Sequence, residues 1–165
     1  MNSNGSLPDQ PYHHFDPNGL YILITGQGLF SPHWGLYLHK EGREGQKFQI
    51  ANVDGPWRHA GGPTKSVVTS KNLSVALKVA TIQPEKHETV SKCAFDLPLI
   101  DYQMFGNIDC RTWVQQVLYD LNADRIINLP EKEIKRIPGE EVKALLAEAK
   151  REDTCIVTES RFYRE

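Results

Sequence analysis

The chain has 165 residues, of which 39% are hydrophobic and 24% charged, and its formal net charge is -2. This is the composition of one globular domain with a sizeable core, and it excludes wholesale disorder. Positive charge is not concentrated in any segment, which argues against nucleic acid as a partner, and no run of about 18 apolar residues predicts a membrane span.

Residues 1–18 are polar and contain three prolines, and they lack the basic start and the apolar run of a secretory signal. We therefore expect a flexible leader, residues 1–18, followed by a single α+β domain, residues 19–165, in a soluble cytoplasmic protein. The three cysteines form no CxxC pair, so in a reducing compartment all three are expected as free thiols. Neither a zinc knuckle nor a redox dithiol is indicated.

The first half of the chain alternates short apolar runs with turn residues, which is the pattern of β-strands. It predicts strands over residues 20–25, 33–39, 47–53 and 74–82. The intervening residues 54–63 are rich in glycine and proline and are expected to form a loop.

The clearest helix is predicted over residues 109–122. Its apolar side chains recur at the i, i+3, i+4, i+7 spacing of one buried face, so Trp113 and Val117 are expected inside and Gln115 outside.

A second helix is predicted over residues 140–151, because acids gather in its first turn and bases in its last. Residues 154–158 are expected to form a closing strand, and residues 84–99 fit a short helix, a strand or both. Strands that come first and helices that come late predict an α+β fold, with a small antiparallel sheet packed against the helix over residues 109–122.

Two motifs that bind cofactors or metals are incomplete in this sequence. The pair Gly26-x-Gly28 lacks the third glycine and the following helix of a dinucleotide-binding loop. The six histidines form no HxxxH or HExxH arrangement, and His33 and His39, on one face of an expected strand, would lie ~20 Å apart. We therefore expect neither a cofactor nor a metal.

Cys110 lies at the start of the predicted 109–122 helix, where unpaired amides and the positive end of the helix dipole favour a thiolate. His33 opens a strand and is suited to take the thiol proton. Gln49, on the next strand, is suited to accept from the other imidazole nitrogen and so fix its tautomer. The helix start and an imidazolium at His33 favour the thiolate while Asp109 opposes it, so a modest lowering of the pKa of Cys110 is expected.

Three segments resemble the circularly permuted branch of the papain-like superfamily, which includes NlpC-type and lecithin–retinol acyltransferase-like enzymes. They read HWGLYL from His33, KFQI from Lys47 and NIDCRTWV from Asn107. In that branch the histidine strand precedes the cysteine helix. The resemblance implies a papain-like fold in permuted order, with His33 as base, Gln49 as orienting residue and Cys110 as nucleophile. The chain departs from the pattern in Asp109, which separates Asn107 from the cysteine, and in having glutamine as the third residue.

The resemblance implies a hydrolase, or a transferase of acyl or amide groups, that forms a thioester at Cys110 with a small-molecule, peptide or acyl substrate. Hydrolysis, transfer and cyclisation share this intermediate and stay open, as does the oligomeric state. Candidate substrate-binding side chains flank the base, lie in the loop at 54–63 or lead into the cysteine helix. They are Trp34, Trp57, Arg58, His59, Tyr102 and Phe105.

Other interpretations of the same residues stay open. A cysteine on the apolar face of a helix is also typical of a core residue, as we expect of Cys93 and Cys155. The chain would then be a non-enzymatic module that binds a ligand or a protein through the Trp57 loop. A third possibility is a lyase or cyclase in which His33 acts as a base without covalent chemistry.

Overall fold

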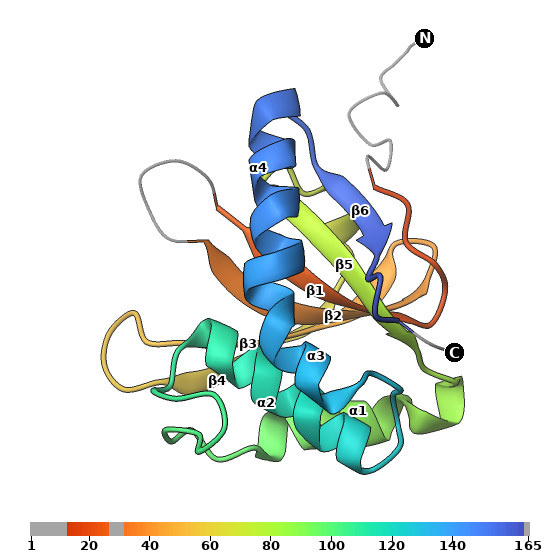
Figure 1. Ribbon diagram of the computed structural model, residues 1–165. Coiled ribbons are helices and arrows are strands. Elements are labelled where there is room, and N and C mark those ends of the chain that lie inside the picture. Colours follow the sequence, from red (N-terminus) through yellow and green to blue (C-terminus); the bar gives the residue numbers. More distant parts are fainter. Residues whose placement is uncertain (1–12, 27–31, 164–165) are drawn as a thin grey trace, which may run out of the picture.

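Within residues 13–26 and 32–163, the part of the chain that the computed structural model describes, six strands form one mixed sheet (Figure 1). The strands lie side by side in the order β4-β3-β2-β1-β5-β6. Their bounds are β1 (Gly19–Thr25), β2 (His33–Glu41), β3 (Glu44–Ala51), β4 (Arg58–Thr64), β5 (Leu73–Thr81) and β6 (Ile156–Glu159). Neighbouring strands are antiparallel, apart from β5 and β6, which are parallel.

The expected strands over residues 20–25, 33–39, 47–53, 74–82 and 154–158 are confirmed as β1, β2, β3, β5 and β6. The α+β class is confirmed as well. The expectation of a purely antiparallel sheet is wrong, because the chain crosses over through helices before it forms β6, and a crossover lets β6 run parallel to β5.

The prediction of a loop over residues 54–63 is wrong for residues 58–63, because strand β4 occupies Arg58–Thr64 at the edge of the sheet. An edge strand needs backbone partners on one side only and therefore tolerates Pro63. Gly61 has a φ of 111°, and a Cβ at this position would lie 2.2 Å from the carbonyl oxygen of Lys47. Only glycine lets β4 approach β3 so closely.

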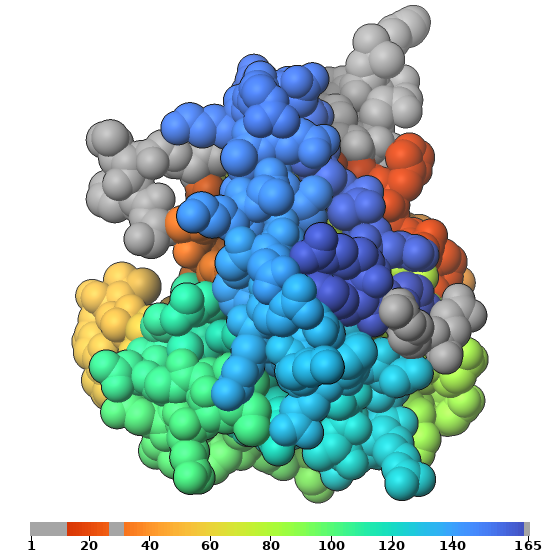
Figure 2. Space-filling model, in the orientation of Figure 1, coloured from red at the N-terminus to blue at the C-terminus, as the bar shows by residue number. Residues whose placement is uncertain are grey.

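Helices pack on one face of the sheet. They are α1 (His87–Asp96), α2 (Cys110–Ala123), α3 (Glu131–Arg136) and α4 (Lys143–Glu152), with a π-helical segment (Ile137–Val142) between α3 and α4. A short 3-10 turn at Pro84–Lys86 precedes α1, and another at Val67–Thr69 lies on the opposite face of the sheet. The region 84–99 thus holds α1, and the second expected helix is confirmed as α4. In the space-filling view, α4 and the segment that follows it lie across the front of the molecule (Figure 2). None of the helices in the described residues has the length and apolar character needed to cross a bilayer.

Helix α2 is the element that carries Cys110, and its start is fixed by a reciprocal cap. The Asp109 carboxylate accepts from the Thr112 amide at 2.8 Å, and the Thr112 hydroxyl accepts from the Asp109 amide at 2.9 Å. Trp113 and Val117 are fully buried, as predicted. These contacts set both the first residue of the helix and its rotation against the sheet.

The prediction that Gln115 would be exposed is wrong, because this side chain is only 6% exposed. Its Nε2 donates to the carbonyl oxygen of Ile134 in α3 at 3.0 Å. Helix α3 covers this side of α2, so a polar residue is buried there with its hydrogen bond satisfied.

The second face of the sheet is covered by irregular chain rather than by helices. Phe15, Val67 and Val68 pack there against Tyr21 and Tyr37. Residues 13–18, assigned from the sequence to a flexible leader, therefore lie against the sheet, and residues 1–12 fall outside the described part of the chain. The packed domain begins before residue 19, where the sequence had placed its start.

Candidate active site

Cys110 is the first residue of α2, and its sulfur touches strand β2. Cys110 Sγ accepts a hydrogen bond from the Trp34 amide at 3.4 Å. The β2–β3 ladder begins only at the pair Leu36–Phe48, so the amide of Trp34 lies beyond it and is not used by β3. Beyond the end of that ladder there is room for the Cys110 side chain, the first of α2.

His33 begins β2 and sits opposite Thr25 of β1. Its Nε2 is 2.9 Å from Gln49 Oε1, and an amide oxygen can only accept a hydrogen bond. When His33 donates this bond, its proton is on Nε2 and Nδ1 keeps the lone pair of a base. The contact between Gln49 and His33 that the sequence predicted is present.

The sulfur lies close to the backbone of His33, because the amide that binds Cys110 is bonded covalently to the carbonyl carbon of His33. Adding the 3.4 Å hydrogen bond to standard backbone dimensions places Sγ within about 6 Å of the His33 Cα. Among the described residues, however, the sulfur makes no hydrogen bond to the imidazole. Resting active sites often show such loose pairs, which tighten when substrate binds.

The expectation of a lowered pKa at Cys110 is wrong, because burial raises the pKa of this thiol. The backbone amide of Trp34 lowers it, the Asp109 carboxylate raises it, and the amides of Arg111 and Cys110 itself lower it again. Half-burial of the sulfur outweighs the amides at the helix start. The resting group is therefore a thiol, and attack on a substrate requires a base to take its proton.

The other two cysteines differ from Cys110 in what surrounds their sulfur atoms. Burial raises the pKa of Cys93 to about 11, with nearby aspartates acting in the same direction, and burial raises that of Cys155 to about 11. Neither pKa is lowered by a hydrogen-bond donor, whereas the backbone amides of Trp34, Arg111 and Cys110 itself all act to lower that of Cys110. Within the described residues, Cys110 has the surroundings best suited to a thiolate.

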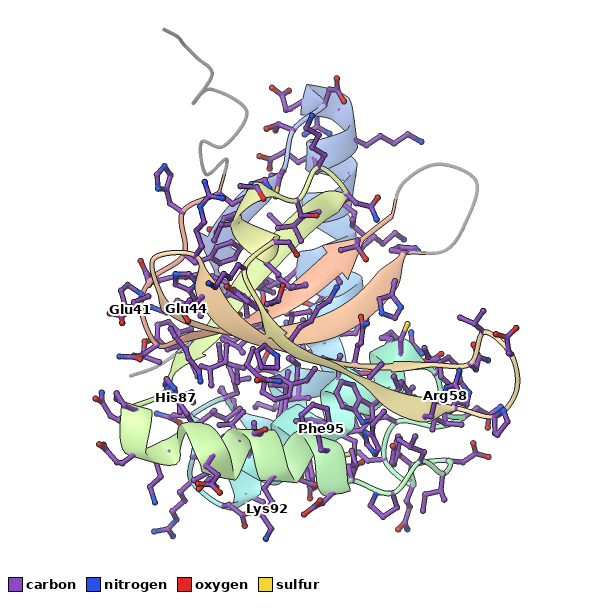
Figure 3. All side chains as sticks on the ribbon, turned by 180° about the vertical axis from the view of Figure 1, so that it is seen from behind. Glu41, Glu44, Arg58, His87, Lys92 and Phe95 are labelled. Carbon is purple, nitrogen blue, oxygen red and sulfur yellow. The ribbon has the colours of Figure 1, made fainter. Side chains whose placement is uncertain are left out.

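The residues proposed for binding in the 54–63 region are mostly packed. Trp57 lies against the main core, and the ring of His59 meets that of Trp113 edge-on, with centroids 6.3 Å apart. His59 Nε2 is also 3.0 Å from the carbonyl oxygen of Leu97. Arg58 alone of the three is exposed, and it lies at the end of the sheet opposite the β2–β3 hairpin (Figure 3).

Tyr102 and Phe105 were expected to form an apolar wall beside the thiol. The Tyr102 hydroxyl donates to the Pro98 carbonyl oxygen at 2.9 Å, burial raises the pKa of Tyr102 to about 12, and Phe105 meets the ring of Tyr119 edge-on. Both side chains therefore have packing partners of their own.

A hollow of about 670 Å³ lies between the 97–104 segment and α2, lined by Tyr102, Gln116 and Tyr119 among others. At about 100° per residue, Gln116 and Tyr119 lie about 240° and 180° around the helix from Cys110. The hollow therefore opens on the other side of α2, and Tyr102 faces it rather than the thiol.

The backbone of Trp34 is the functional group that the sequence did not reveal. Trp34 was chosen for its side chain, which is 7% exposed and belongs to the core, while its amide binds the Cys110 sulfur. A backbone donor carries no residue signature, and only the end of the β2–β3 ladder shows that this amide is available.

No family model, curated protein or solved structure matches the chain. Within residues 13–26 and 32–163, no three His, Cys, Asp or Glu side chains are grouped as metal ligands. What the site can do has to be argued from its own chemistry, which is that of a half-buried thiol bound to the Trp34 amide and an imidazole bound to Gln49.

Proposed function

We propose that the chain is a cysteine enzyme, papain-like in permuted order, that transfers an acyl group from an ester or amide through a thioester at Cys110. One observation carries the proposal. Cys110 Sγ is bound to the amide that follows His33, and the imidazole of His33 is held by Gln49 in the tautomer of a base.

The order of the elements supports the papain-like assignment. Strands β2 and β3, which carry His33 and Gln49, precede helix α2, which carries Cys110 at its first position. The permuted branch has this order. A sheet packed on the cysteine helix and a polar side chain that orients the histidine are further features in common.

In the first half of the reaction, Sγ of Cys110 attacks the carbonyl carbon of the substrate while Nδ1 of His33 takes the thiol proton. The tetrahedral species then collapses, the bond from carbon to the amine or alkoxide breaks, and His33 returns its proton to that leaving group. Water or an amine next attacks the thioester, loses its proton to His33 and restores the thiol. Hydrolysis, transfer and cyclisation differ only in this second nucleophile.

Backbone amides at the start of α2 are placed to stabilise the negative oxygen of the tetrahedral species. The amides of Cys110 and Arg111 act to lower the pKa of the Cys110 thiol, so they favour negative charge at this place. An oxygen on the carbon attached to that sulfur lies close to the same donors, each worth roughly 3 kcal/mol in comparable sites. The positive end of the helix dipole acts in the same direction.

A second candidate function is a non-enzymatic binding module in which Cys110 is a core thiol. Two observations favour it: burial raises the pKa of Cys110, and the sulfur is bound to the Trp34 amide rather than to His33. A structural thiol would satisfy that amide without ever being acylated.

Acylation by p-nitrophenyl acetate separates the two functions. The enzyme should release p-nitrophenol in a burst, gain one acetyl group in its intact mass, and carry that group on Cys110 after proteolysis. Cys110→Ser should abolish the burst, whereas the matched variants Cys93→Ser and Cys155→Ser should keep it. An acetyl group that reaches Cys110 only after unfolding would establish the binding module instead.

A further inference from the structure

Gly35 lies between the two polar side chains of the site, on strand β2. A Cβ at this position would stand 3.2 Å from the carbonyl oxygen of Phe48, 3.6 Å from Gln49 Cβ and 3.9 Å from Gln49 Oε1. The side chain of Gln49 therefore covers the Cα of Gly35. Glycine is present where any other residue would direct its side chain at this amide.

The register of the two strands explains why Gln49 must pass over this position. Leu36 pairs with Phe48, so the antiparallel register puts Gly35 opposite Gln49 and leaves His33 as a diagonal neighbour on the same face. Diagonal neighbours are about 7–8 Å apart, and only a long side chain crosses that distance. Gln49 crosses it over Gly35 and meets His33 Nε2 at 2.9 Å.

We propose that Gly35 is a positioning residue for the His33 base: its missing side chain is the passage through which the Gln49 amide reaches the imidazole. Its importance for catalysis rests on the proposed function, whereas its effect on the His33 tautomer does not. The backbone conformation of Gly35 is not a left-handed one, so the role of glycine here is space rather than flexibility.

Three substitutions grade the effect. Gly35→Ala places a Cβ at ordinary contact distance from Gln49 Oε1 and should leave the His33–Gln49 bond in place after a small shift at Phe48. Gly35→Val adds γ carbons about 1.5 Å further out, which fall on the position of the amide. Gly35→Ser adds a hydroxyl within reach of Oε1 and competes with the imidazole for it.

The direct readout is the tautomer of His33, measured from the ¹⁵N shifts of histidine-labelled protein and assigned with His33→Ala. The parent and Gly35→Ala should show the proton held on Nε2. Gly35→Val, Gly35→Ser and Gln49→Ala should all show a mixture of tautomers. If Gly35→Val fails to fold, Gly35→Ser decides in the same way.

A double-mutant cycle shows whether Gly35 acts through Gln49. In the parent background, Gly35→Val should slow alkylation of Cys110 by roughly five- to tenfold, the value of one hydrogen bond. In the Gln49→Ala background the same change should have no further effect. A parent-like tautomer in both Gly35→Val and Gly35→Ser, or additive losses in the cycle, would overturn the proposal. An unreactive Cys110 with the expected tautomers would overturn the proposed function alone.

Discussion

Strand β2 carries His33 at its start and His39 near its end, and the two imidazole rings have different surroundings. In Figure 3, Glu41 and Glu44 mark the β2–β3 hairpin that lies next to His39, and Arg58 marks the opposite end of the sheet. His33, at that opposite end, is half-buried and bound to Gln49 of the next strand.

His39 is only 3% exposed, and its Nδ1 is 2.8 Å from the hydroxyl of Tyr37. The ring of Phe15 covers it at a centroid distance of 5.5 Å, and the Asn18 amide donates to its carbonyl oxygen at 2.8 Å. Burial lowers the pKa of His39, with Asp16 opposing, so the ring is held neutral and away from water. Two histidines of one strand thus separate into a packing residue and a candidate base according to what covers them.

The largest effect is expected from disrupting helix α2, which packs against β2. Val117 is fully buried in α2, so Val117→Asp places an unpaired charge in the core. This costs several kcal/mol against a total stability of about 5–15 kcal/mol, and the domain should unfold. A melting curve monitored by circular dichroism measures it.

Arg111→Asp is the matched control, because it puts the same carboxylate on an exposed position in the first turn of α2, where acids are favoured. A Val117→Asp protein that melts like Arg111→Asp would show that the buried face of α2 is assigned wrongly.

The contrast between the two histidines is tested by replacing each with alanine. His39→Ala leaves a cavity under Phe15 and a buried Tyr37 hydroxyl without its partner, which should cost about 2–4 kcal/mol of unfolding free energy. His33→Ala should cost less than about 1 kcal/mol, because its ring is half-buried at the strand end. Urea unfolding of both variants measures the two losses. Equal losses of unfolding free energy would show that His39 is no more a packing residue than His33.

The pH dependence of stability sharpens the same contrast. The folded pKa of His39 lies below the value of about 6.5 in the unfolded chain, so the unfolded state binds more protons between the two values. The contribution of His39 is therefore complete above about pH 6.5 and is lost as the pH falls through the unfolded value towards the folded one. Unfolding free energies of the parent and of His39→Gln should converge on acidification, and parallel curves would show that His39 is not held neutral by the fold.

The smallest effect on stability is expected from Asp109→Asn. Asparagine caps helices as well as aspartate does, so the unfolding free energy should change by less than about 0.5 kcal/mol. The charge that raises the pKa of Cys110 is removed, so the pKa should fall and alkylation at neutral pH should become faster. Asp109→Ala, which loses charge and cap together, is the control. A slower reaction in Asp109→Asn would mean that the carboxylate helps the thiol by some other route.

Much of this fold follows from local patterns. The spacing of Trp113 and Val117 defined the buried face of α2, and Cys110 was placed at the start of the helix predicted over residues 109–122, where the structure shows Asp109 as the cap. The contact between His33 and Gln49 was expected because the two residues lie on neighbouring strands of a predicted hairpin.

The features that the sequence did not predict depend on contacts between distant segments. Gln115 is buried because α3, about 20 residues further on, covers it, and the donor to Cys110 comes from the Trp34 backbone, 76 residues earlier. The raised pKa of Cys110 likewise depends on burial, which is a property of the assembled site rather than of the helix start. Strand β4 was hidden by its glycines and proline, which only an edge position tolerates.

The reactivity of Cys110 as a function of pH tests the central claim most directly. Labelling by iodoacetamide, followed residue by residue with mass spectrometry between about pH 7 and pH 10, compares the three thiols in one protein. Cys110 should react before Cys93 and Cys155, whose pKa values are near 11, and His33→Ala should slow Cys110 alone while His39→Gln leaves it unchanged. Labelling of Cys110 only on denaturation, or at a rate that is the same in His33→Ala, would contradict the claim that Cys110 is a nucleophile whose proton His33 takes.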